Sequence, residues 1–132
     1  MEPETVADNT PLNKPLYPWF GSKRRVADVI WSAFGDVRNF VDPFMGTCSV
    51  LLTSPWPAKR TETVNDLDGF IVNAWRSIQY SPEETARHAD WIVSEHDLTA
   101  RHYWLVTEGK RIVSEHINDP RWHNAEIAGW IS

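Results

Sequence analysis

This sequence of 132 residues has little cysteine, no long apolar run and no excess of positive charge. Its single cysteine, Cys48, excludes an internal disulfide and a cysteine-rich zinc site. No apolar stretch approaches the ~20 residues of a membrane span, and the acidic, polar N-terminus is unlike a secretory signal. We therefore expect a cytoplasmic protein without membrane contact.

The net charge of −5 excludes a generally basic nucleic-acid-binding surface. The one tight cluster of positive charge is Lys23-Arg24-Arg25, so we expect any contact with DNA to be weak. No two of the five histidines stand four residues apart, the spacing of a helical metal pair, so we expect no metal site. The eight tryptophans are many for this length, and several should be buried or form a contact surface.

The first part of the sequence alternates helical and strand patterns. Residues 1–16 are proline-rich and predict a mobile leader. Residues 17–80 then predict helix, strand, helix, strand and helix, at 21–34, 39–42, 46–53, 61–65 and 67–78. This order is typical of parallel strands joined by crossover helices.

The second part, residues 81–132, is predicted to be all-helical. Ser81-Pro82-Glu83-Glu84 has the pattern of a capping box, from which a helix should run to about residue 95. A longer helix is predicted over about 98–117, with its apolar side chains inward, and a last one over about 122–130; the inward set is Leu105, Val106, Ile112 and Val113. The fold class is thus α/β, a partial Rossmann-like core of two or three parallel strands followed by an all-helical segment.

Polar residues at the ends of the two predicted strands indicate a ligand site. Asp42 ends the first strand and is followed by a turn containing Gly46, while Asp66 follows the second strand. Ligands of open α/β folds bind at this edge, and an acidic residue about 20 positions after the glycine turn is placed to hold a ribose. With the Tyr17–Lys23 segment, this pattern predicts a pocket for a nucleoside with a charged tail. The alternative is that Asp42 only caps a helix and Gly46 only turns the chain.

Three segments carry a resemblance to a known family. Tyr17–Lys23 (YPWFGSK) resembles the Trp-x-Gly-Gly-Lys motif of the Dam-like DNA adenine methyltransferases. Phe40–Val50 (FVDPFMGTCSV) resembles their Glu-Pro-Phe-x-Gly-Ser-Gly motif, and Asn65–Asp68 (NDLD) resembles their Asn-Asp-x-Asn segment. The tail from Leu98 resembles the helical insert of phage-type members. Two positions depart from the pattern, because Ser22 and Cys48 stand where the family usually has glycine.

The resemblance implies S-adenosylmethionine as a cofactor. By this analogy Trp19 packs on the cofactor, Lys23 reaches its carboxylate and Asp66 holds its ribose. Asp42 and Gly46 line the methionine side of the cofactor, and Gly21 of the first motif completes the predicted site.

The catalytic Asp-Pro-Pro-Tyr tetrad of that family is missing from the sequence, and its nearest string is Asn118-Asp119-Pro120-Arg121. The sequence therefore resembles only the N-terminal portion of the family, with no catalytic residue. We expect at most cofactor binding, without DNA methylation by this chain alone. The alternative is a phage-borne, non-enzymatic inhibitor or interaction module, for example an anti-defence or anti-CRISPR protein. Either way the incomplete sheet must be covered by the helical segment, a second copy or another protein.

Overall fold

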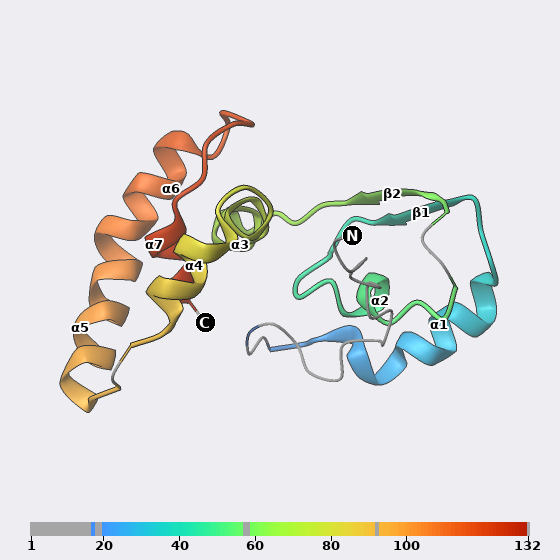
Figure 1. Ribbon diagram of the computed structural model, residues 1–132, viewed down its shortest axis with the longest axis horizontal. Coiled ribbons are helices and arrows are strands. Elements are labelled where there is room, and N and C mark those ends of the chain that lie inside the picture. The colour runs from blue at the N-terminus through green and yellow to red at the C-terminus, as the bar shows by residue number, and fades with distance from the viewer. Residues whose placement is uncertain (1–16, 18–19, 57–58, 92, 132) are drawn as a thin grey trace, which may run out of the picture.

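Two lobes lie on either side of helix α3 in the computed structural model (Figure 1). The structure describes residues 17, 20–56, 59–91 and 93–131, so the predicted leader and Trp19 lie outside the described residues. We call Tyr17 with residues 20–66 the α/β lobe and residues 81–131 the helical lobe. Within the described ranges, no helix is long and apolar enough to cross a membrane.

The α/β lobe contains a parallel pair of strands, as predicted. Its elements are η1 (Lys23–Val26), α1 (Ala27–Phe34), β1 (Asn39–Asp42), α2 (Ser49–Leu52) and β2 (Thr61–Val64). The two strands run in register from Asn39 opposite Thr61 to Asp42 opposite Val64. Gly35 ends α1 with a φ of 68°, a conformation that glycine adopts without steric cost. The predicted fold class is confirmed: helices and parallel strands alternate, and an all-helical segment follows.

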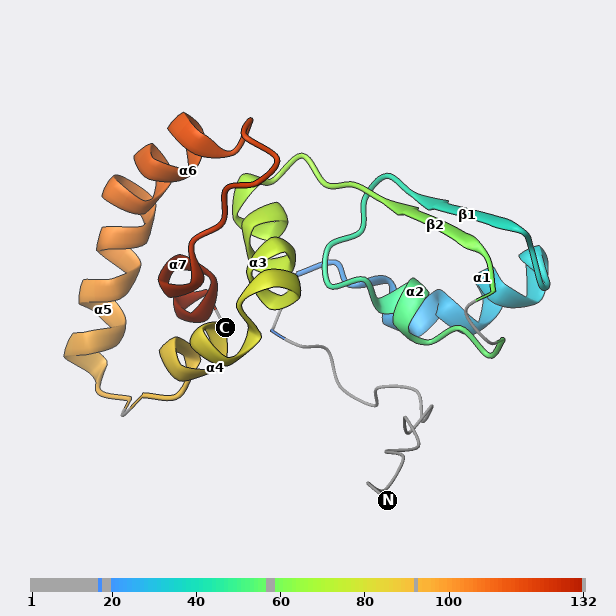
Figure 2. The same cartoon turned by 45° about the horizontal axis from the view of Figure 1, so that its top comes forward.

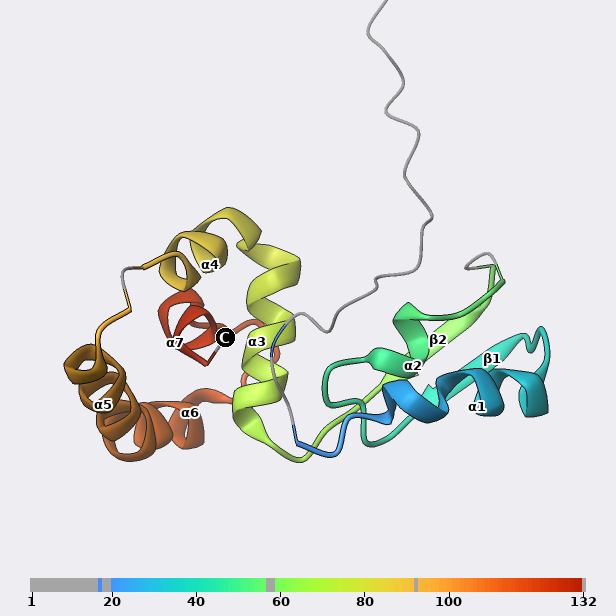
Figure 3. The same cartoon turned by 90° about the horizontal axis from the view of Figure 1, so that it is seen from below.

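Helices α1 and α2 cover one face of this sheet (Figures 2 and 3). Trp31 of α1 is the centre of the contact: its ring stacks on Phe40 at 4.9 Å, and its Nε1 donates to the Val50 carbonyl at 2.7 Å. Burying so large a ring with its polar atom satisfied gives the small lobe a stable core. The opposite face, which carries Val41, is exposed among the described residues.

Helix α3 (Gly69–Tyr80) joins the two lobes. It begins at Asp68, whose carboxylate accepts a hydrogen bond from the Phe70 amide at 2.9 Å, a standard N-cap. Ile71 is fully buried in a cluster with Met45 of the α/β lobe. On the other side, Asn73 exchanges two hydrogen bonds with the backbone of Asn124. The position of each lobe is therefore set by one helix.

The helical lobe packs around its last helix. Its elements are α4 (Pro82–Ala89), α5 (Glu95–Trp104), η2 (Leu105–Gly109), α6 (Lys110–His116) and α7 (Ala125–Trp130). Helix α7 lies against both α3 and α4. At Gly129 the backbones are so close that a Cβ would lie 2.6 Å from the His88 Cβ and 2.7 Å from the His88 carbonyl carbon, so only glycine fits there.

Three local expectations about the helical lobe are wrong. Helix α4 ends at Ala89 instead of near residue 95, and the chain leaves the helix where Trp91 stacks on the Arg101 guanidinium, 3.5 Å from the ring centroid. Ser81 does not cap α4 with its side chain, because its Oγ is hydrogen-bonded to His123 Nε2 at 2.9 Å. Val106, predicted inward, is half exposed because it borders open cavities.

Candidate functional site

Lys23 ties the entry segment, by which we mean residues 20–23, to the turn after β1. Its Nζ donates to both carboxylate oxygens of Asp42, at 2.5 and 2.7 Å, and to the Phe44 carbonyl at 2.6 Å. Asp42 is only 6% exposed, so the Lys23 ammonium group is the cation that compensates its buried carboxylate. One oxygen of Asp42 also accepts the Phe44 amide, at 3.1 Å. Entry segment, strand end and turn are thereby fixed as one unit.

Asp66 holds the glycine turn from the neighbouring strand. One carboxylate oxygen accepts the Gly46 amide at 2.9 Å, and the other accepts the Asp68 amide at 3.0 Å. The Gly46 carbonyl in turn accepts the Tyr17 hydroxyl at 3.0 Å and the Trp75 indole N–H at 2.9 Å. Burial raises the pKa of Tyr17, so its hydroxyl stays a proton donor.

The two departures from the family motifs have structural explanations. Ser22 lies within hydrogen-bond distance of Ser49, Oγ to Oγ 2.9 Å, and Thr47 Oγ1 lies 2.5 Å from the same Ser49 Oγ, so hydroxyls link the entry segment to α2. Cys48 has a φ of 52°, a left-handed conformation that glycine adopts most easily. Its side chain is buried, and burial raises the pKa of the thiol to about 12, so it is a packing residue and not a nucleophile.

Four of the six predicted site residues line one cavity of about 210 Å³. They are Gly21, Lys23, Gly46 and Asp66, and the remaining lining residues are Ser22, Phe44, Met45 and Thr47. Asp42 lies behind Lys23 and borders a separate groove instead. Trp19 lies outside the described residues. The structure thus places Gly21, Gly46 and the carboxylate of Asp66 around one cavity.

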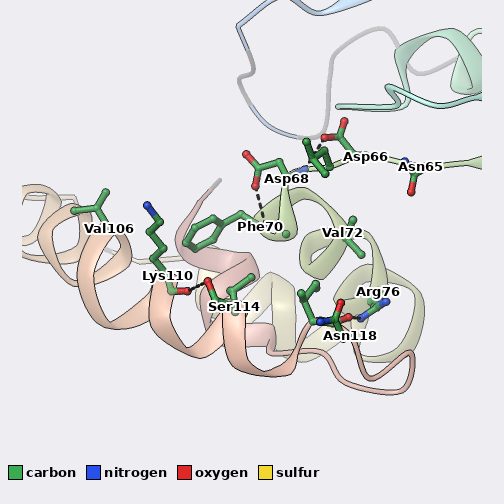
Figure 4. A pocket seen from close by; sticks show the side chains of 14 residues that line it. Asn65, Asp66, Asp68, Phe70, Val72, Arg76, Val106, Lys110, Ser114 and Asn118 are labelled. Atoms are coloured by element: carbon green, nitrogen blue, oxygen red, sulfur yellow. Dashed lines mark hydrogen bonds between the residues drawn. The ribbon is translucent and has the colours of Figure 1, made fainter.

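A larger cavity of about 740 Å³ borders the same carboxylate. It extends from the turn between β2 and α3 to helix α6. Figure 4 shows Asp66 and Asp68 on the side of the turn, with Lys110 and Ser114 across from them. The side chain of Leu67 on its rim is 96% exposed. The carboxylates of Asp66 and Asp68 thus lie at one end of this cavity and the ammonium group of Lys110 lies at the other.

The residues present fit a nucleoside ligand in part. A volume of 210 Å³ is below the ~300 Å³ at the low end of ligand pockets, but the larger cavity continues from Asp66. A carboxylate has about four acceptor positions, and the two backbone amides on Asp66 leave room for a pair of ribose hydroxyls. Lys23, in contrast, uses its three N–H donors on Asp42 and Phe44. It can reach a cofactor carboxylate only by leaving them.

Three residues that shape the site were not among the predicted site residues, although two of them lie in segments that the sequence singled out. Tyr17 and Trp75 support Gly46 from 29 positions away in either direction, and no local pattern reports such contacts. Phe44 lines the cavity although its side chain is 74% exposed. Among the described residues, no group of three or more His, Cys, Asp or Glu side chains could hold a metal ion.

Comparison with known proteins identifies the family. A family model described as D12 class N6 adenine-specific DNA methyltransferase matches residues 19–120. No curated protein and no solved structure matches the chain. The family match spans the entry segment, the ends of both strands, helix α3 and most of the helical lobe, well over half of the sequence. The chain therefore belongs to the D12 class of N6 adenine-specific DNA methyltransferases.

Proposed function

We propose that this chain binds S-adenosylmethionine in the cavity between the entry segment and the glycine turn. Methyltransferases of this class generally use that cofactor. The observation that carries the proposal is the position of Asp66. It follows the end of a parallel strand, borders both cavities and retains acceptor positions for two hydroxyls.

The residues of the site take different roles in this proposal. Asp66 accepts the ribose hydroxyls, and Gly21 and Gly46 let the ligand approach the backbone closely. Lys23 and Asp42 hold the turn in place, because their charges are already paired with each other. When bound, the cofactor would supply an electrophilic methyl group; this chain's residues would bind and orient it.

Methyl transfer to DNA is not assigned to this chain alone. The 132 residues contain no Asp-Pro-Pro-Tyr tetrad to hold the adenine amine. The chain's only tight cluster of positive charge includes Lys23, which is ion-paired with Asp42, so we propose no tight contact with DNA either. The proposal for these 132 residues is therefore limited to binding of the cofactor.

A second candidate function is a protein-interaction module, such as a phage-borne inhibitor of a defence system. It is favoured by the exposure of Val41 on a sheet that has one open face among the described residues. Parallel sheets are normally covered on both faces. This function requires no cofactor, so the same binding measurement separates the two.

Isothermal titration calorimetry with S-adenosylmethionine tests the proposal. The most informative variant is Phe44→Ser. The exposed ring of Phe44 borders the cavity, and only the Phe44 backbone takes part in hydrogen bonds. Loss of ~1–2 kcal/mol of apolar contact should weaken binding by about tenfold. The matched control is Tyr103→Ser, an exposed ring on α5 that borders neither cavity, which should bind normally. Absence of binding heat with the natural sequence would refute the cofactor proposal.

Asp66→Asn is the second variant. It replaces one carboxylate oxygen by an amide nitrogen, so the hydrogen bond from the backbone amide of either Gly46 or Asp68 is lost as well. Its thermal melt must therefore be recorded alongside the titration. A large loss of affinity with a small change in melting temperature supports a ribose contact, whereas equal losses in both would reduce Asp66 to a structural residue.

A further inference from the structure

A further cavity, of about 390 Å³, lies between the start of α3 and helices α5 and α7. It shares no lining residue with the 210 Å³ cavity proposed for the cofactor. Seven of its ten lining residues are apolar, and the other three are Asp68, Arg101 and His102. A volume within ~300–1,000 Å³ and a mostly apolar lining with few polar groups are typical of sites for small organic molecules. Part of the lining comes from η2, a π-helical turn, and such turns are frequent at functional sites.

Arg101 has aromatic neighbours in this cavity but no polar partner. Its guanidinium carbon lies 3.5 Å from the centroid of the Trp91 ring and 4.7 Å from that of the Trp130 ring. Within the described ranges, the Arg101 side chain makes no hydrogen bond or ion pair, and its Nη1 is buried without an acceptor. Stacking covers the faces of a guanidinium and leaves its in-plane N–H donors uncommitted. A charged donor held in this way, without an acceptor, is costly unless a ligand supplies one.

Carboxylates are abundant in the helical lobe, yet none of the described ones is paired with Arg101. Residues 81–131 contain nine acidic and five basic residues. The other three arginines of this lobe are each ion-paired within it: Arg87, Arg111 and Arg121. One acid borders the cavity, Asp68, but its carboxylate caps α3 by accepting the Phe70 amide. The cavity therefore combines an unpaired cation with an acid that is already in use.

We propose that this cavity binds a small aromatic carboxylic acid. The carboxylate of the ligand accepts two parallel hydrogen bonds from Arg101, a geometry that the guanidinium group matches, and its ring packs on apolar side chains such as Leu98. A phosphate is a poorer occupant, because no lysine or second arginine borders the cavity to share its charge. Charges more than ~8 Å away are largely screened at physiological ionic strength. Direct contact with Arg101 therefore outweighs the acidic excess of the lobe.

An NMR titration of isotope-labelled protein with cinnamate tests this proposal. The indole N–H signals of Trp91 and Trp130 report binding, because both rings border the cavity. We expect cinnamate to shift both signals and its neutral analogue cinnamamide to bind at least tenfold more weakly. Equal binding of acid and amide, or no shift of either signal up to the solubility limit of the acid, overturns the proposal. The titration contains no S-adenosylmethionine, so its result is independent of the proposed function. Displacement of cinnamate by added S-adenosylmethionine would place the acid in the cofactor cavity and would also overturn the proposal.

Two variants test whether Arg101 holds the acid. Arg101→Met keeps an unbranched side chain but removes the donors, so the affinity for cinnamate should fall at least tenfold, to that of cinnamamide. The matched control is Arg87→Met, an exposed arginine of α4 outside this cavity, which should bind cinnamate normally. Leu98→Asp places a carboxylate three positions before Arg101 on α5, where the two can pair, and should exclude cinnamate. If thermal melting shows that Arg101→Met does not fold, Leu98→Asp decides, because Leu98 is half exposed. Undiminished cinnamate binding by either folded variant contradicts the proposal.

Discussion

Replacing Lys23 by methionine tests whether its charge holds the protein together. The substitution keeps an unbranched side chain but leaves the Asp42 carboxylate, 6% exposed, without its cation. An unpaired buried charge costs about 3–5 kcal/mol. The Lys23 side chain is itself 32% exposed, so water can replace part of the lost interaction. We therefore expect the free energy of unfolding to fall by about 2–3 kcal/mol.

Urea unfolding followed by tryptophan fluorescence and circular dichroism measures this loss without any ligand. Asp42→Asn and the double variant Lys23→Met/Asp42→Asn complete a thermodynamic cycle, in which the loss in the double variant should be smaller than the sum of the single losses by about 1–3 kcal/mol. A loss under ~0.5 kcal/mol for Lys23→Met, with no coupling to Asp42, would refute the reasoning. If that variant also lost S-adenosylmethionine binding, Lys23 would be a ligand contact, as the family resemblance implies.

Three further predictions concern the packing around α3, α7 and Cys48. Gly129→Ala places a Cβ within 2.6–2.8 Å of His88 and its neighbour, so thermal melting should show a loss of about 1–3 kcal/mol, and an unchanged melt would mean that α4 can move away. Asn73→Leu leaves the half-buried Asn124 amide without its acceptor; we expect a loss of about 1–3 kcal/mol and faster hydrogen exchange at that amide. Burial raises the pKa of Cys48 from 9.0 to about 12, so native protein at pH 8 should react with iodoacetamide about a thousandfold more slowly than unfolded protein. Because the unfolded thiol loses its proton first, the free energy of unfolding should also fall as pH rises from 9.0 to about 12; rapid labelling of native protein would contradict both statements.

The strands and the central helix could be predicted because their signals are local. The strand at 39–42 was predicted with the bounds that the structure gives, and the second differs by one residue, since its ladder ends at Val64. The stripe of apolar residues before Tyr80 predicted α3 for the same reason. Carboxyl ends of parallel strands meet at one edge, so the proximity of Gly46 and Asp66 also followed from order alone.

The parts that sequence reasoning missed depend on contacts between distant residues. The ion pair of Lys23 with Asp42 competes with the contact to a cofactor carboxylate that the family resemblance implies for Lys23. Only the three-dimensional structure reveals this ion pair. The early end of α4 reflects the stacking of Trp91 on Arg101 from the next helix. No local pattern marks Trp91 or Arg101 as partners. Helix propensity and apolar periodicity therefore predict a helix that continues past its true end.

Adjacent residues of α3 anchor opposite parts of the molecule. Trp75 donates its indole N–H to the Gly46 carbonyl at the cavity, while the Arg76 guanidinium is shared by the carbonyls of Ile117, Asp119 and Trp122. If the glycine turn moves, either the hydrogen bond from the Trp75 indole breaks or helix α3 tilts. A tilt of α3 would also move the loop after α6, to which Arg76 is bonded. Binding at the cavity would thus be transmitted to the loop that contains Ile117, Asp119 and Trp122 through a single turn of helix.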